Sequence, residues 1–449
     1  MPGASRNQQG SSAGTSGTSG TSRWSEERAE RELRSLELFG MRFGLDRMRR
    51  MMTALGSPER RFQSIQVLGT NGKSSTTRMT AAILERHGLH TGAYTSPHLI
   101  AWRERVLIDE RELAPEDFSA AVARADHAAQ QVNRTLAEDD HVTQFELLTA
   151  AALWEMARRG VDVGVVEAGL GGRYDATSVV APAVTVLTNV ALEHTRWLGS
   201  TIADIAEEKL AVVQPGATLV LGRGLAPEAL AVAERVAGER EAEIVRPAEL
   251  PPGLRLRARG AFQRRNLALA RAAAEAHLRR IGRELDEAAV RDAAAIVAIP
   301  GRLQTLAQDP LTVLDGAHNP DAVAALVEAL PEVFGDQAPA LVMGVLEDKD
   351  AAGMLRMLLP RCRRAWFTAP PGPRALPPAA LLSQARQLGF EDTDCEPRPE
   401  RALAATRAWA AEHGAGVLVT GSVYLVGELL GELRAAQDGR AAGAEGSRR

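Results

Sequence analysis

Short apolar runs rich in valine and isoleucine alternate along this chain with longer segments in which apolar residues have helical spacing. Such alternation is typical of βαβ units, in which helices cover a largely parallel sheet. In the first part of the chain, the predicted strands are Ser64–Leu68, Val161–Val166, Val184–Thr188 and Thr218–Leu221. The fold class that follows from this pattern is α/β.

A second series of apolar runs begins after Pro300-Gly301. Its predicted strands, each followed by a helix-like segment, are Thr312–Leu314, Ala340–Met343, Arg364–Thr368 and Gly416–Thr420. We therefore predict a larger α/β domain over residues 23–298 and a smaller, Rossmann-like α/β domain over residues 299–434. Residues 1–22 and 435–449 are polar and rich in small side chains, and we expect both to be disordered tails.

Composition excludes several classes of protein. The chain has 449 residues, and its 57 acidic and 53 basic residues give a formal net charge of -4, which provides no overall positive field to attract nucleic acid or an anionic membrane. No apolar run approaches the ~20 residues that span a bilayer. The only cysteines, Cys362 and Cys395, stand outside any metal-ligand spacing. We expect a cytoplasmic monomer with no nucleic-acid or membrane partner, no disulfide and no zinc site.

Lysine is scarce in this chain. Only three of the 53 basic residues are lysines, namely Lys73, Lys209 and Lys349. Arginine serves wherever a general positive charge is enough, so each remaining lysine is expected to supply something that arginine lacks. A compact ammonium for a phosphate is one such property, and an amine that can be deprotonated and modified is another. The alternative is chance retention on the surface.

A glycine-rich turn follows the first predicted strand and precedes a helical segment. In a phosphate-binding loop (P-loop), backbone N–H groups and the helix dipole face the anion, a lysine reaches the outer phosphates, and a hydroxyl coordinates Mg²⁺. We therefore predict a P-loop ATPase domain built on a parallel-rich sheet, although Val67 replaces the first glycine of the general motif. The candidate nucleotide-binding residues are Gly69, Thr70, Asn71, Gly72, Lys73, Ser74 and Ser75.

Polar residues also follow two later strands of this domain. Glu167 ends a buried-looking strand, His194 follows the next strand, and Lys209 lies on the helix after it. Ligands of open α/β sheets bind at the carboxyl ends of strands, which makes Glu167 a candidate metal ligand near the nucleotide. The alternatives are a tight turn at Glu167 and a structural role for His194.

Three predicted strands of the second domain end in polar clusters as well. The clusters are Asp315–Asn319, Glu347–Asp350 and Thr420–Ser422. Parallel strands present their carboxyl ends at one edge of a sheet, so the clusters predict a single ligand-binding edge. For each cluster alone, the alternative is a solvated loop.

Several motifs occur in a definite order between about residues 30 and 432. They are Gly69–Lys73, Thr95–Leu99, Glu104–Val106, Phe145–Thr149, Glu167–Arg173, Asp315–Pro320 and Asp348–Asp350. Taken together, they resemble the folylpolyglutamate synthase/dihydrofolate synthase family of the Mur ligase superfamily. The resemblance implies ATP-dependent amide formation. The γ-phosphate would pass to the carboxylate of a pterin-linked acid, and the amino group of L-glutamate would attack the acyl phosphate.

The resemblance also implies roles for residues of the first domain. Lys73 with Ser74 or Ser75 would bind the phosphates of ATP. A first Mg²⁺ would be held by Ser75, Ser96 and Glu167. Hard oxygen ligands of this kind suit Mg²⁺.

A second Mg²⁺ site is implied at His194 and Lys209. A charged lysine would be repelled by the metal, whereas carbamylation by CO₂ converts the amine into an anion that can ligate Mg²⁺. The resemblance places a carbamylated lysine at Lys209. The alternative is a surface lysine paired with Glu207 or Glu208.

Four further residues match family positions near the nucleotide and glutamate. Asn266 and Arg302 match positions that contact ATP, and Asp315 and His318 would face the nucleotide and glutamate from the second domain. The residues to which the resemblance assigns a catalytic part are Lys73, His194, Lys209, Arg302 and His318.

The chain departs from the family pattern at four positions. Ser74 replaces a glycine, Phe262 a histidine, Tyr174 a leucine and Ser178 an asparagine. Phe262 and Tyr174 concern the nucleotide and pterin surroundings and do not belong to the phosphate and metal residues.

Two other functions are compatible with parts of the sequence. A peptidoglycan-type Mur ligase would share the ATP loop and the second-domain motifs but would need an additional amino-terminal domain. The roughly fifty residues between the predicted tail and Lys73 are too few for one. A non-catalytic, ATP-gated binding protein would leave the Asp315–Pro320 and Lys209 regions without a role. Within the favoured family, the acceptor is open between dihydropteroate, folate polyglutamates or both.

Overall fold

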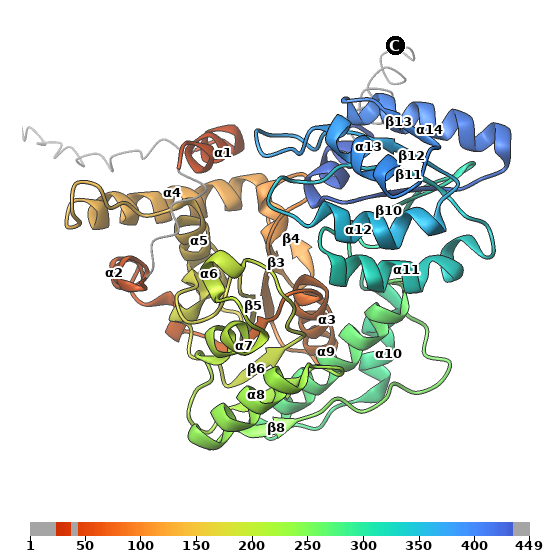
Figure 1. Cartoon of the computed structure of the whole chain (residues 1–449). Coiled ribbons are helices and arrows are strands. Elements are labelled where there is room, and N and C mark those ends of the chain that lie inside the picture. Colours follow the sequence, from red (N-terminus) through yellow and green to blue (C-terminus); the bar gives the residue numbers. More distant parts are fainter. Residues whose placement is uncertain (1–23, 37–43, 434–449) are drawn as a thin grey trace, which may run out of the picture.

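The computed structural model describes residues 24–36 and 44–433, and the tails predicted at 1–22 and 435–449 lie outside these ranges. Two sheets, one before and one after Pro300, form the described part of the chain (Figure 1). Helices pack on both faces of each sheet. The α/β fold class predicted from the sequence is therefore confirmed.

The first sheet has the strand order β4-β3-β2-β5-β1-β6-β7-β8. The short strands β3 and β4 run antiparallel at one edge, and the other strands are parallel. The bounds are β1 Gln63–Leu68, β2 Thr91–Tyr94, β3 Val106–Ile108, β4 Arg111–Glu112, β5 Val163–Glu167, β6 Val184–Leu187, β7 Thr218–Leu221 and β8 Glu243–Val245.

Alternate residues of these strands point to opposite faces, and each face is covered by its own helices. On β1, Val67 packs with α3, α9 and α10, whereas Leu68 packs on the opposite face with α7 and α8. Helices α1, α2, α4 and α5 cover the rest of that second face. The bounds are α1 Glu26–Ser35, α2 Asp46–Ala54, α3 Lys73–Arg86, α4 Pro115–Asn133, α5 Gln144–Arg159, α6 Thr195–Leu198, α7 Ile202–Leu210, α8 Pro227–Glu239, α9 Ala261–Arg280 and α10 Glu287–Ile296.

The second sheet has the order β13-β12-β11-β14-β10-β9, in which β9 alone is antiparallel. Strands β11, β14 and β10 are neighbours, so the three polar clusters predicted after them meet at one edge. The strands are β9 Gln304–Gln308, β10 Leu311–Leu314, β11 Ala340–Met343, β12 Arg364–Phe367, β13 Thr393–Cys395 and β14 Val417–Thr420.

Helices α11, α12 and α13 cover one face of this sheet, and α14 with a helix over residues 423–433 covers the other. Within the described ranges, no helix combines the length and the apolar character that a membrane crossing requires. The bounds are α11 Pro320–Phe334, α12 Ala351–Leu358, α13 Pro378–Gln387 and α14 Pro399–His413.

All eight strands predicted from the sequence occur, with ends displaced by no more than two residues. The prediction missed β2, β3, β4, β8, β9 and β13. The chain passes from α10 to β9 through residues 297–303. The domain limits of 23–298 and 299–434 stay predictions.

Candidate active site

A cavity of about 800 Å³ lies between the two sheets. Its wall combines the loop after β1, the ends of β5 and β6, part of α9 and the first turns of α11. The structure brings every predicted site residue to this one wall. These residues are Gly69, Thr70, Asn71, Gly72, Lys73, Ser74, Ser75, Ser96, Glu167, His194, Lys209, Asn266, Arg302, Asp315 and His318.

The loop between β1 and α3 requires glycine at two positions. Gly69 has a φ of 145°, and a Cβ atom there would lie 1.9 Å from Thr188 Oγ1. Gly72 precedes α3 with a φ of 80°, and a Cβ atom there would lie 2.5 Å from Asn266 Oδ1. The loop can therefore pack closely while the first turn of α3, with its free N–H groups and positive dipole end, faces the cavity.

Two of the three lysines bind consecutive carbonyl groups of this loop. Lys73 Nζ donates to the carbonyl oxygen of Thr70 at 3.0 Å, and Lys209 Nζ donates to that of Gly69 at 2.9 Å. The Lys209 side chain is buried. Burial, with a further contribution from the Lys73 charge, lowers the pKa of Lys209 to about 7. A large fraction of Lys209 is therefore an uncharged amine at neutral pH.

Two residues that the sequence analysis did not assign to the site hold the loop from β6. The side-chain oxygen of Asn189 accepts hydrogen bonds from the N–H of Thr70 at 3.2 Å and of Asn71 at 2.8 Å. Thr188 Oγ1 donates to the carbonyl oxygen of Asn71 at 2.6 Å. Thr188 ends the strand predicted at Val184–Thr188 and Asn189 follows it, but of this strand end only His194 was predicted as a site residue.

Glu167 ends β5 as a fully buried carboxyl group. It accepts hydrogen bonds from the Ser74 hydroxyl at 3.0 Å and from the backbone N–H of Ser96 at 3.0 Å. Burial raises the pKa of Glu167 to about 7, although the nearby charge of Lys73 acts in the opposite direction. A cation at this position would therefore stabilise the ionised form.

The oxygen atoms around Glu167 fit a magnesium ion. No cluster of three or more His, Cys, Asp or Glu side chains suited to a metal occurs in the described part of the chain. Glu167 lies instead beside serine hydroxyls. Mg²⁺ is commonly bound by one or two carboxylates together with substrate phosphates and waters, so this donor set suits an ion that arrives with a nucleotide. At Lys209, by contrast, the unmodified amine is a hydrogen-bond donor, and a metal would fit there only if the amine became an anion.

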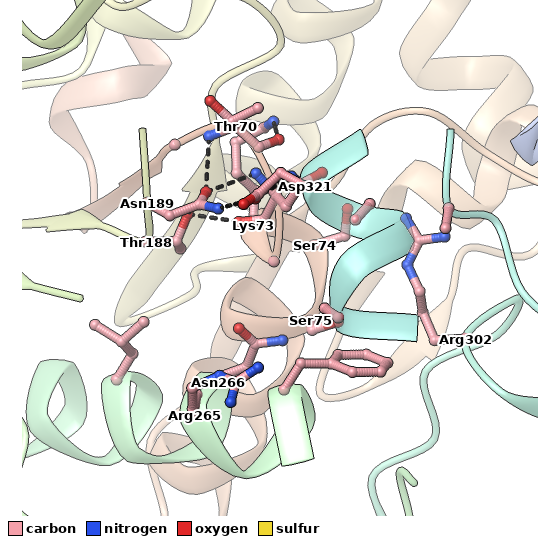
Figure 2. A pocket seen from close by; sticks show the side chains of 18 of the residues that line it. Thr70, Lys73, Ser74, Ser75, Thr188, Asn189, Arg265, Asn266, Arg302 and Asp321 are labelled. Carbon is pink, nitrogen blue, oxygen red and sulfur yellow. Dashed lines mark hydrogen bonds between the residues drawn. The ribbon is translucent and has the colours of Figure 1, made fainter. Parts of the chain in front are cut away.

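Helices α9 and α11 border the far end of the cavity. Asn266 Nδ2 donates to the buried Gln263 Oε1 at 3.0 Å, which orients the amide beside Gly72. Arg265 and Glu328 form an ion pair of 3.0 Å between the two helices. Figure 2 shows Asn266 and Arg265 on α9, below the phosphate loop.

The second domain contributes Arg302, Asp315 and His318. Both carboxylate oxygens of Asp315 accept backbone hydrogen bonds, from Leu303 at 2.9 Å and from Ala317 at 2.8 Å, and thus hold the segment that carries Arg302. His318 Nδ1 lies 2.9 Å from the carbonyl oxygen of Gly316. A carbonyl can only accept, so Nδ1 carries the proton. Burial lowers the pKa of His318 to about 4, which leaves a neutral ring with a free lone pair on Nε2 at neutral pH.

The phosphate loop also contacts the second domain directly. Asn71 and Asn319 exchange side-chain hydrogen bonds of 3.0 and 3.2 Å. The Asp321 carboxylate accepts from both Asn71 and Asn189 at 2.8 Å (Figure 2). Asn319 caps α11 and Pro320 is its first residue. The start of this helix therefore presents Asn319 and Asp321 to the phosphate loop.

A buried ion pair forms a second contact between the domains. Lys349 Nζ lies 3.0 Å from Glu193 Oε1, and His318 Nε2 lies 3.6 Å from the same oxygen. Burial opposes ionisation of Glu193, but His318 and Lys349 together lower its pKa to about 2. The sequence marked Lys349 through the scarcity of lysine and through the polar cluster Glu347–Asp350, but it gave no indication of Glu193 as its partner.

Comparisons with known proteins agree with this arrangement. Residues 67–221 match the family model of the Mur ligase middle domain, and residues 301–423 match that of the Mur ligase glutamate ligase domain. The chain is 34% identical over 403 residues to the folylpolyglutamate synthase of Lacticaseibacillus casei, which covers 84% of this chain and 92% of that protein. It is 30% identical over 420 residues to the dihydrofolate synthase/folylpolyglutamate synthase of Bacillus subtilis, which covers 88% and 96%.

A solved structure shows the same likeness in three dimensions. It is that of Escherichia coli FolC in complex with DHPP and ADP, and it matches with a TM-score of 0.79 and 30% identity over 92% of this chain and 99% of that one. The fold, the two family domains and the full-length relatives lead to one assignment. This chain belongs to the folylpolyglutamate synthase/dihydrofolate synthase family of the Mur ligase superfamily.

Proposed function

We propose that the cavity between the domains uses ATP to activate the carboxylate of a pterin-linked acid and joins it to the amino group of L-glutamate. One observation supports this most strongly. The phosphate loop, the Glu167 carboxylate and the polar segment from Asp315 to His318 of the second domain line a single cavity. An ATP-gated binding protein would need the first of these features but not the third.

In the first step, a carboxylate oxygen of the acceptor attacks the γ-phosphorus, and ADP leaves. The N-terminus of α3 and Lys73 bind the phosphates, and Arg302 reaches the same cavity from the second domain, where it can bind a phosphate in a bidentate manner. Glu167, with Ser75 and Ser96, would hold Mg²⁺, which supplies charge neutralisation on the phosphates when bound. The protein mainly positions the reactants and stabilises charge.

In the second step, the glutamate amine attacks the acyl carbon and inorganic phosphate leaves. The ammonium group of glutamate must lose one proton to become a nucleophile, and its nitrogen loses another when the amide forms. His318 is suited to accept that proton because it lines the cavity and its neutral ring leaves Nε2 unprotonated. Glu193 beside it carries the charge that would stabilise the protonated ring.

Lys209 is proposed to react with CO₂. Its neutral amine would attack the carbon of CO₂ and release a proton, which leaves a carbamate anion on Nζ. The buried position and the lowered pKa of Lys209 favour the neutral amine that this reaction needs. The resulting anion, together with His194 on the same cavity wall, would form the second magnesium site.

The acceptor and the amine can be identified in one experiment. Purified protein is supplied with MgATP, labelled L-glutamate and either dihydropteroate or a folate monoglutamate, and the products are analysed by mass. Addition of one glutamate to either acid supports the proposal, and a mass ladder on the folate identifies chain extension. ATP hydrolysis at the same rate without glutamate and without acceptor would contradict it.

The cellular setting follows from the sequence. The scarcity of cysteine and the absence of any long apolar run support a cytoplasmic enzyme. We also propose that it acts as a monomer.

A further inference from the structure

A second cavity, of about 500 Å³, adjoins the first. Four residues line both cavities: Ser74, Pro97, Arg302 and Val423. Ser74 and Arg302 lie at the end of the first cavity where the phosphates would be, and in the view of Figure 2 Arg302 is on the opposite side of Ser74 from Asn189. A ligand in the second cavity would therefore lie next to Ser74 and Arg302, which also line the first cavity.

Arg78 is the most notable side chain of this second cavity. It lies on α3 one turn after Ser74, so both residues share a helix face. Its guanidinium is largely buried, and within the described residues no carboxylate lies within ion-pair distance of it and no hydrogen bond is made to it. Burial lowers the pKa of Arg78, although an arginine keeps its charge at neutral pH. Glu112, Glu110 and Glu104 act on its charge only from beyond ion-pair distance. A partly buried cation without a direct partner leaves its hydrogen-bond donors available for an anion in the cavity.

The acidic residues around Arg78 are already committed to other partners. Both oxygens of Glu104 accept backbone N–H groups, from residues 99, 100 and 101 at 2.9 to 3.1 Å. Glu112 lies 3.5 Å from the Arg103 guanidinium, and Glu110 lies 3.8 Å from that of Arg86. The remaining charged residues that line the cavity are Arg257, Arg259 and Arg302. The cavity therefore has an excess of positive charge.

We propose that Arg78 is a specificity-determining residue that binds a carboxylate of a glutamyl group in this second cavity. The inference rests on the proposed function, which requires an amine substrate bearing carboxylates next to the acyl phosphate. The planar guanidinium matches a carboxylate with two parallel hydrogen bonds, and a buried pair of this kind is selective. Two sources have the same chemistry, namely the incoming L-glutamate and the glutamyl tail of the acceptor.

The test compares Arg78→Met with Arg124→Met. Methionine keeps most of the length of the side chain and removes the charge, and Arg124 is an exposed arginine on helix α4, away from both cavities. For Arg78→Met, we expect the KM of the carboxylate ligand to rise about ten- to a hundredfold, with the KM of ATP unchanged. Arg78→Lys should recover part of the loss. Equal KM values in Arg78→Met and Arg124→Met overturn the proposal.

Different acceptors distinguish the two sources. If the cavity binds the incoming amino acid, the KM of L-glutamate rises with dihydropteroate, which has no glutamyl tail, as well as with folates. If it binds the tail, the KM of folate mono- and diglutamates rises, whereas those of dihydropteroate and L-glutamate do not. Either result supports carboxylate binding at Arg78.

Hydroxylamine separates binding from chemistry. This small amine carries no carboxylate and converts an acyl phosphate into a hydroxamate with release of phosphate. With dihydropteroate as the acid, Arg78→Met should form hydroxamate at the wild-type rate. If the rate of hydroxamate formation fell as much as the rate of glutamate addition, Arg78 would be merely structural. Absence of glutamate-dependent turnover in the wild type would instead refute the proposed function itself.

Discussion

The side-chain amine of Lys209 lies 2.9 Å from the carbonyl oxygen of Gly69, which ties helix α7 to the phosphate loop. Helix α7 begins at a capping box formed by Thr201 and Asp204, with hydrogen bonds of 3.1 Å in both directions, and this start places Lys209 in its last turn. The contact brings a buried amine with a lowered pKa to the edge of the nucleotide cavity. The proposed carbamate and metal site at Lys209 would therefore be linked directly to the phosphate loop.

Replacement of Lys209 tests the carbamate. Lys209→Ala should lower kcat about ten- to a hundredfold, because a metal ligand is lost, and acetate should restore part of the activity by occupying the vacated position. Removal of CO₂ and bicarbonate should slow the wild type. A Lys209→Arg variant with full activity would falsify the carbamate, since arginine does not form this group.

Glu167 should make the stability of the nucleotide-free, metal-free protein depend on pH. Its folded pKa of about 7 lies above the ordinary value of 4.5, so its stabilising contribution is complete below about pH 4.5 and is lost as the pH rises through 7. The difference amounts to about 3 kcal/mol. Urea unfolding should show that Glu167→Gln gains about this much stability relative to wild type between pH 5 and pH 8.5. If the free energy of unfolding had the same pH dependence in wild type and in Glu167→Gln, the pKa of Glu167 would not be raised by burial.

The ion pair between Glu193 and Lys349 should couple the two domains. Each side chain is nearly buried, at 12% and 10% exposure, and removal of one partner leaves a charge in a poorly solvated place. Lys349→Met or Glu193→Gln alone should therefore lower the free energy of unfolding by about 3 kcal/mol. The double variant should be more stable than the sum of the two losses predicts. Simple additivity would show that the pair is solvated and does not couple the domains.

Arg302 should act on turnover rather than on folding. Within residues 24–36 and 44–433, its guanidinium makes one long hydrogen bond, of 3.3 Å to Gly301, and it lines both cavities, so its removal costs few contacts. Arg302→Ala should cut kcat at least about a hundredfold, as expected when a donor to a developing charge is removed, with an unchanged melting temperature. Near-normal turnover would show that Arg302 does not bind the transferred phosphate.

Much of the fold follows from apolar runs along the chain, and the exceptions have physical causes. Strands such as Ala340–Met343 are buried on both faces and appear as continuous apolar runs. Strand β2 includes a glycine, β4 has two exposed residues, and β9 is half-buried, so none of them shows such a run. A continuous apolar run marks a strand only where its side chains are apolar as well as buried, and β2, although buried, begins with Thr91 and Gly92.

The site, like the fold, contains residues that the sequence predicts and contacts that it does not. The phosphate loop, Glu167 and Asp315 stand directly after strands, where the rule for open α/β sheets predicts ligands. The bonds of Asp321 to Asn71 and of Lys349 to Glu193 join residues 250 and 156 positions apart. They exist because two domains dock, and nothing local in the sequence encodes the partner of such a side chain.

The central claim is that an acyl phosphate links ATP cleavage to amide formation, and an isotope measurement tests it directly. An acceptor acid whose carboxylate carries ¹⁸O at both oxygens is incubated with protein, MgATP and L-glutamate, and the released phosphate is analysed by mass. If the carboxylate attacks the γ-phosphorus, one ¹⁸O atom passes into each phosphate and the other remains in the amide carbonyl. Phosphate without ¹⁸O, formed at the rate of amide formation, would contradict the account.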